Sequence, residues 1–129
     1  MEKQTLEKKK KVHNNISYLQ YDLPTDQAKT SFFDISDISA IQKMHPEALQ
    51  EMHCHNFYSI FWFNAGEGTH IVDFDEYEIG QGTVFFLSPK PIHTYRNLNN
   101  VDGIAMCFPE EFLLKIDNEL QGRIKTKMF

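Results

Sequence analysis

Alternating apolar and polar residues mark the middle of the chain as a series of short β-strands. The clearest segment, from His53 to Phe63, is apolar on both faces near its end, so both faces are expected to be covered. One face can look into a barrel, while the other needs a second layer from N-terminal strands, a C-terminal helix or a partner chain. The first face carries His53, His55, Phe57, Ser59, Phe61 and Phe63.

Other β-forming segments follow at roughly ten-residue spacing, which is typical of all-β sandwiches and barrels. We predict strands at 16–21, 69–74, 77–79, 83–87 and 101–108, with one or two more within 31–41. Turns are predicted at 64–68, 80–82 and 98–100, with a bulge at Gly103.

Two proline residues mark predicted helix starts. Pro46 suits the first position of a helical turn, and Pro109 precedes two glutamates that favour the positive end of a helix dipole. An apolar stripe follows Pro109, which predicts an amphipathic helix there. The pattern as a whole therefore predicts an all-β barrel with a C-terminal helix.

Charge is distributed unevenly along the 129 residues, whose number fits one domain. The formal net charge is -5, but without residues 1–11, which hold five lysines and two glutamates, 8 basic and 16 acidic groups remain. We expect residues 1–14 to form a flexible basic tail. The acidic remainder is expected to repel nucleic acid.

The cysteines and the apolar runs indicate where the protein works. Cys54 and Cys107 form no disulfide framework and no metal-binding spacing, so free thiols in a reducing cytosol are expected. The N-terminus lacks the apolar core of a secretory signal, and the longest apolar run is too short for a membrane span. We expect a cytoplasmic protein without membrane contact.

Several motifs occur together along the chain: His53-Cys54-His55, Gly66-Glu67-Gly68, the segment 82–89, His93, and the passage from strand to helix at 103–113. In combination they resemble the cupin-type sensor domain of AraC-family transcription regulators. The resemblance covers about residues 33–117.

The resemblance implies a fold and a set of partners. The fold would be a cupin-like double-stranded β-helix, or jelly-roll, over residues 15–108, followed by the start of a helical linker at 109–129. The protein would bind a small-molecule effector such as a sugar and form a homodimer. DNA would be contacted only through a further C-terminal domain that this chain lacks.

The broader cupin pattern also raises a metal site. His53, His55 and His93 match three of its ligands and Asn97 matches its final asparagine, but Ser59 stands where the pattern has a glutamate. Serine is a poor ligand for a divalent transition metal, so we expect neither a metal nor another cofactor. The alternative is a metal-dependent cupin enzyme, a dioxygenase or isomerase, with a three-histidine site.

The candidate ligand-binding residues lie on the predicted strands around these histidines. The aromatic members could equally be core residues, and the whole barrel could be a filled interaction module. His70 is expected to be an ordinary strand residue, and no nucleophile elbow or oriented triad indicates catalysis. The ligand-binding candidates are His53, His55, Phe57, Ser59, Phe61, His93, Tyr95 and Arg96.

Overall fold

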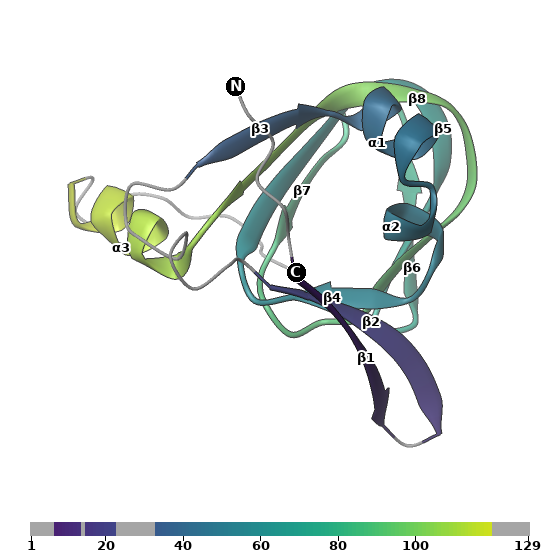
Figure 1. Ribbon diagram of the computed structural model, residues 1–129. Helices are drawn as coiled ribbons and strands as arrows, with labels where there is room; N and C mark the ends of the chain where they lie inside the picture. Colours follow the sequence, from purple (N-terminus) through teal and green to yellow (C-terminus); the bar gives the residue numbers. More distant parts are fainter. Residues whose placement is uncertain (1–6, 14, 23–32, 120–129) are drawn as a thin grey trace.

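The computed structural model describes residues 7–13, 15–22 and 33–119 (Figure 1). Within them, the strands form one sheet in the order β1-β2-β4-β8-β5-β6, with β3 beside β8 and β7 beside β5. The strands are β1 (Glu7–His13), β2 (Ile16–Asp22), β3 (Asp34–Asp37), β4 (His53–His55), β5 (Tyr58–Val72), β6 (Asp75–Ile79), β7 (Val84–Leu87) and β8 (His93–Phe108). The helices are α1 (Ile38–Met44), α2 (Glu47–Gln50) and α3 (Glu110–Glu119).

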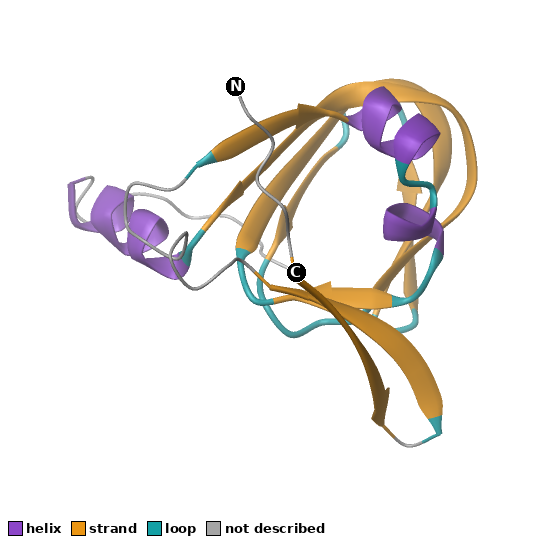
Figure 2. Ribbon diagram, viewed as in Figure 1, coloured by secondary structure: helices purple, strands orange, loops and turns teal. Residues whose placement is uncertain are grey.

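Strands dominate the structure and wrap around a central space, with α3 outside the barrel (Figure 2). The predicted fold class, an all-β cupin-like barrel with a C-terminal helix, is confirmed, although the sheet is left open rather than closed. No helix among the described residues is long and apolar enough to cross a membrane.

The four strands β3, β8, β5 and β7 form a continuous antiparallel wall whose register sorts residues into rows. Because strand residues alternate between faces, each row across the wall belongs to one face. Two inner rows are Asp34–Cys107–Ser59–Leu87 and Ser36–Ala105–Phe61–Phe85. Two outer rows are Ile35–Met106–Ile60–Phe86 and Asp37–Ile104–Trp62–Val84.

The long strands β5 and β8 remain paired across segments that the sequence marks as turns. The predicted turns at 64–68 and 98–100 are therefore wrong, because both lie within strands, where register shifts replace a chain reversal. The predicted irregularity at Gly103 coincides with the first of these shifts. Gly103 has φ 150°, and a Cβ there would collide with the backbone carbonyl of Trp62. Glycine is thus required at this position, because any side chain would collide with the neighbouring strand.

The N-terminal region differs from the prediction of a flexible tail. Residues Glu7–His13 form β1, which pairs antiparallel with β2 in a hairpin that projects from the barrel (Figure 1). Residues 1–6 and 14 lie outside the described residues. All of β1 is exposed, so backbone pairing with β2, which the lysine-rich composition did not indicate, holds it in place.

The segment 31–41 is only partly a strand. The strand β3 is followed directly by α1, which the alternation had not indicated. Ile38, the first residue of this helix, is fully buried, so tertiary packing outweighs the strand-like pattern. The predicted helical turn after Pro46 is confirmed as α2, with Pro46 at the N-cap.

Aromatic side chains attach α3 to the end of the barrel. Phe108, the last residue of β8, is buried between Phe33 and Phe112, with ring centroids 6.0 and 5.3 Å away. Tyr58 stacks on Phe108 at 6.1 Å from the neighbouring strand. The predicted C-terminal helix is confirmed, and its first turn is packed against the strand that precedes it.

Candidate functional site

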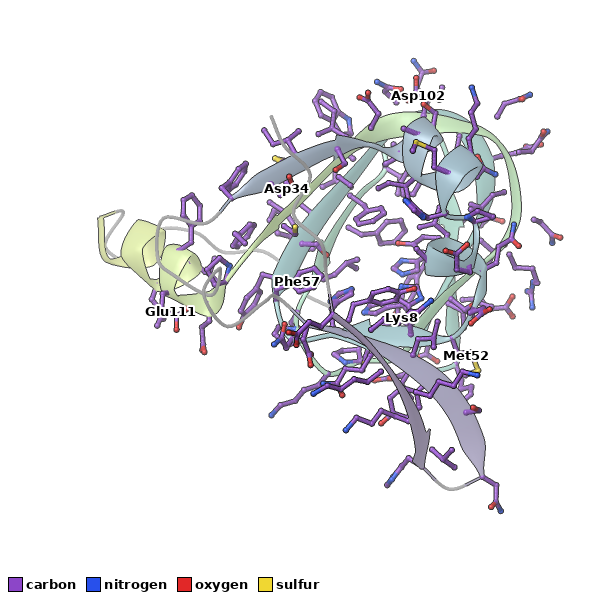
Figure 3. The ribbon with its side chains drawn as sticks, in the orientation of Figure 1. Lys8, Asp34, Met52, Phe57, Asp102 and Glu111 are labelled. Carbon is purple, nitrogen blue, oxygen red and sulfur yellow. The ribbon has the colours of Figure 1, made fainter. Side chains whose placement is uncertain are left out.

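A cavity of about 470 Å³ lies against the inner face of the β3–β8–β5–β7 wall. Its volume is in the range of small-molecule sites, which is roughly 300–1,000 Å³. The opposite side is formed by β4, α2 and the β1–β2 hairpin, and Figure 3 marks Lys8 of β1 and Asp34 of β3 on different sides of the barrel. Residues lining the cavity include Tyr21, Ser36, Leu49, His53, His55, Phe57, Ser59, Phe61, Tyr95, Ala105 and Cys107.

Six of the eight candidate ligand-binding residues therefore line this cavity. They are His53, His55, Phe57, Ser59, Phe61 and Tyr95. The strand predicted from His53 to Phe63 is interrupted after His55, and β5 begins at Tyr58. Phe57 lies in this interruption yet is buried and stacks on His55, with ring centroids 4.7 Å apart.

His53 and His55 are buried and held in defined tautomers by backbone carbonyls. The Nδ1–H of His53 donates to the Glu51 carbonyl at 2.7 Å, and that of His55 donates to the Phe57 carbonyl at 3.2 Å. Burial lowers the pKa of His53, and it lowers that of His55 further, with the neighbouring His93 and His53 adding to the effect. Each neutral ring thus keeps Nε2 as a hydrogen-bond acceptor.

Ser59 and Tyr95 bring buried hydroxyl groups to the cavity wall. Within the described part of the chain, neither Ser59 Oγ nor Tyr95 Oη has a hydrogen-bond partner. Tyr95 is 3% exposed and Ser59 is 4% exposed, and burial raises the pKa of the Tyr95 phenol. A buried hydroxyl without a partner costs about 1–3 kcal/mol, so these two groups favour a polar molecule in the cavity.

His70 and His93 form a second layer behind the cavity wall. Both are fully buried, and His70 Nε2 lies 3.1 Å from His93 Nδ1, so one ring donates to the other. His70, which was expected to be an ordinary strand residue, lies in β5 and stacks on Tyr95 with ring centroids 4.4 Å apart. Burial lowers the pKa of each imidazole to about 3, with nearby histidines adding to the effect. His93, a candidate ligand contact, is thus placed beneath His55 rather than on the wall.

Arg96 lies outside the cavity. Its guanidinium forms an ion pair with Glu76 on the exposed side of the sheet. Tyr95 and Arg96 are consecutive residues of β8, so their side chains point to opposite faces. The structure therefore separates Arg96 from the other candidates.

The sequence interpretation missed charged residues at the cavity edge. Lys8, Asp34 and Glu47 line the cavity from three different elements, and none was a candidate. Lys8 was not a candidate because residues 1–14 were expected to form a flexible tail. No arginine is among the residues that line the cavity in the described part of the chain.

The histidines do not assemble into a metal site in this structure. The ring centroids of His53, His55 and His93 lie 5.2–6.0 Å apart. Yet no group of three or more histidine, cysteine, aspartate or glutamate side chains in the described ranges is placed to hold a metal ion. His93 Nδ1 is engaged by His70, and Ser59 supplies no carboxylate. The residues present therefore do not fit the cupin metal centre.

Comparison with known proteins places these features in a family. The family model for the AraC-like ligand binding domain matches residues 36–120. The HTH-type transcriptional activator RhaR of Enterobacter sp. (strain 638) is 24% identical over 98 residues, which are 74% of this chain and 34% of the relative. The chain thus spans about a third of that relative's length. Among solved structures, the plu4264 protein of Photorhabdus luminescens is 15% identical with a TM-score of 0.43, and 77% of this chain and 94% of that one are covered.

Proposed function

Because the chain belongs to the AraC-like ligand binding domain family, we propose that it senses a small-molecule effector in the cavity on the inner side of the β3–β8–β5–β7 wall. The observation that carries the proposal is the pair of buried hydroxyls of Ser59 and Tyr95 on that wall, neither of which has a hydrogen-bond partner among the described residues. An effector that hydrogen-bonds to them would recover the free energy lost by their burial.

The cavity chemistry favours a neutral effector with several hydroxyl groups and one apolar face. His53 and His55 supply acceptors, while Ser59 and Tyr95 both donate and accept. Phe57 and the half-buried Phe61 supply apolar walls. A sugar has this combination of groups. A carboxylate or phosphate ligand would meet two carboxylates, Asp34 and Glu47, against the single lysine Lys8 and no arginine among the described lining residues.

The proposed output is a change in self-association and, in a longer regulator, in DNA binding by a separate domain. The helix α3 is joined to the cavity wall through Phe108, so rearrangement of the wall would reposition its first turn. The effector must bind one arrangement more tightly than the other for this to occur. We propose a cytoplasmic homodimeric sensor rather than an enzyme, consistent with the free cysteines Cys54 and Cys107.

The test is thermal stabilisation by a panel of neutral sugars and polyols, compared between two neighbouring substitutions. Tyr95→Phe removes a hydroxyl from the cavity wall, and Arg96→Gln removes a charge from the opposite face of the same strand. We expect Tyr95→Phe to keep the stability of the free protein within about 1 kcal/mol, because the lost hydroxyl has no partner. It should weaken binding of the best panel member roughly tenfold, while Arg96→Gln leaves binding unchanged.

Two results would contradict this proposal. Equal ligand affinity in wild type and Tyr95→Phe would show that the ligand occupies another place. Stabilisation by stoichiometric iron, manganese, nickel or zinc that is lost in His53→Ala would favour the metal-dependent enzyme instead.

A further inference from the structure

The inner face of the β3–β8–β5–β7 wall is polar toward the edge that β3 forms. The inner row Asp34–Cys107–Ser59–Leu87 lines the cavity along its whole length and carries a carboxylate, a thiol and a hydroxyl side by side. In the next inner row only Ser36, at the same edge, is polar. We call Asp34, Ser36, Cys107 and Ser59 the polar strip of the cavity.

Contacts within the polar strip direct the Asp34 carboxylate toward the interior. The Ser36 hydroxyl donates a hydrogen bond to Asp34 Oδ2 at 3.2 Å. Burial, with the charge of Asp34 adding to it, raises the pKa of the Cys107 thiol to about 12, so the thiol keeps its proton beside the carboxylate. Asp34 is thus half-buried at the rim but acts on groups that line the cavity.

Asp34 forms no ion pair within the described part of the chain. The ion pairs of Lys9 and Arg96 are made with other carboxylates, and Lys8 lines the cavity from a different side of the barrel (Figure 3). An ionised carboxylate offers about four acceptor sites, and Ser36 uses one of them. The remaining sites can accept hydrogen bonds from a molecule in the cavity.

The Ser59 hydroxyl is the second group of the polar strip that points to a ligand. Ser59 is 4% exposed, and its Oγ has no hydrogen-bond partner among the described residues. Asp34 and Ser59 lie two strand spacings apart in one row, about 9.6 Å, with only the short side chain of Cys107 between them. A single small molecule lying over Cys107 can therefore reach both groups.

The chemistry of these two groups limits what that molecule can present. An ionised carboxylate only accepts hydrogen bonds, so the part of the molecule at Asp34 must donate them. Two adjacent hydroxyl groups match the two carboxylate oxygens, and hydrogen bonds to an ionised acceptor are stronger than those between neutral groups. Ser59 both donates and accepts, so it can bind either a hydroxyl group or a ring oxygen.

We infer that Asp34 determines the specificity of the cavity by accepting hydrogen bonds from two adjacent hydroxyl groups of the effector, while Ser59 contacts the same molecule. The inference rests on the proposed function and adds the group that recognises the sugar. It also fixes the orientation of the effector, whose adjacent hydroxyl groups lie at the β3 edge of the wall. A sugar that lacks one of these hydroxyls is rejected even where it fills the cavity equally well.

The first experiment uses the wild-type chain and isothermal titration. The probes are the tightest-binding sugar or polyol of the panel and each of its monodeoxy analogues. We expect two analogues, which lack adjacent hydroxyl groups, to bind roughly tenfold to hundredfold more weakly than the parent, the effect of losing a hydrogen bond to a charged group.

The second experiment repeats the titrations with two matched substitutions on β3. Asp34→Asn keeps the size of the side chain and a carbonyl oxygen for Ser36 but removes the charge, so it should weaken binding of the parent sugar roughly tenfold to hundredfold. The two sensitive analogues should bind this variant no more than about threefold more weakly than the parent does, because the contact they lack is already lost. Asp37→Asn makes the same change on the exposed outer side of the strand and should leave every affinity unchanged.

The results that overturn the inference are distinct from those that overturn effector sensing. Unchanged affinity in Asp34→Asn, or equal penalties for the analogues in this variant and in wild type, overturns the inference alone, since binding that Tyr95→Phe weakens still supports sensing. Failure of every panel member to bind wild type overturns both. Far-ultraviolet circular dichroism and the melting temperature show whether Asp34→Asn keeps its fold. If it does not, the wild-type series decides, and the lack of two adjacent sensitive hydroxyl groups overturns the inference.

Discussion

The two faces of the β3–β8–β5–β7 wall are built from alternate residues of the same strands, yet they differ in exposure and in the polar groups that they carry. The inner face places Ser59, Phe61 and Ala105 against a cavity and leaves a buried hydroxyl without a partner. The two outer rows leave Trp62 and Val84 about half exposed, and Asp37 is their one charged residue. Apolarity alone therefore does not identify the role of a sheet face. Buried polar atoms without a partner, such as those of the inner face, are what favour a ligand in the cavity.

Acidification should have the largest effect on stability, because the imidazoles of His70 and His93 are buried behind the cavity wall. The pKa of both His70 and His93 is lowered to about 3 in the folded state, against about 6.5 when unfolded. Their contribution to stability is complete above about pH 6.5 and is lost as the pH falls toward 3. Between pH 7.5 and pH 5, urea denaturation should show the free energy of unfolding falling by at least about 4 kcal/mol, because His53 and His55, whose pKa burial also lowers, add to the loss from His70 and His93.

A single substitution checks the origin of this acid sensitivity. His70→Gln keeps a hydrogen-bonding group beside His93 but removes one titrating ring, so it should reduce the pH-dependent loss by about 2 kcal/mol. An undiminished loss in this variant would assign the acid sensitivity to other groups.

Substitution of Gly103 should damage both faces at once. Gly103→Ala places a Cβ against the Trp62 carbonyl at a positive φ, which forces β8 away from β5. We expect a loss of about 3 kcal/mol in urea denaturation, from overpacking together with backbone strain. Gly82→Ala is the matched control, because Gly82 also has a positive φ but open space around it, and should cost about 1 kcal/mol. Equal costs for the two variants would show that close strand contact is not what requires glycine at position 103.

The smallest expected effect comes from substitutions at neighbouring residues on the two faces of β8. Ala105→Leu extends an inner side chain into the cavity and should weaken effector binding about tenfold, with less than about 1.5 kcal/mol change in stability. The next residue toward the N-terminus, Ile104, faces outward, so Ile104→Val should leave effector binding unchanged. Isothermal titration with the best ligand from the sugar panel measures both. Equal affinity in all three proteins would place the ligand away from this wall.

The fold class could be predicted from the sequence because most strands alternate apolar and polar residues and follow one another at short, regular spacing. The sequence predicted much of the cavity wall for the same reason, since the alternation from His53 placed five of its lining residues on one face. The failures arose where tertiary contacts overrode a local signal. The segment 64–68 looks like a turn, but pairing with β8 keeps it in a strand.

Residues contributed by distant elements were not predictable from local pattern. Lys8 lies on the cavity edge only because β1 pairs with β2, and β2 in turn pairs with β4. His70 shares a predicted face with Val72, which was a signal for burial. Its contact with His93, 23 positions along the chain, depends on the register of β5 against β8.

The unbroken path of β8 gives the proposed sensor a short mechanical linkage. Ala105 lines the cavity and Phe108 packs against α3, and the three residue steps from one to the other span about 10 Å of extended chain. The helix α3 follows the end of β8 and has ten residues, so it is about 15 Å long. If α3 tilted by about 5° at Phe108, its far end would move by about 1.3 Å. A small rearrangement of the cavity wall around an effector would thus produce a larger displacement at the far end of α3.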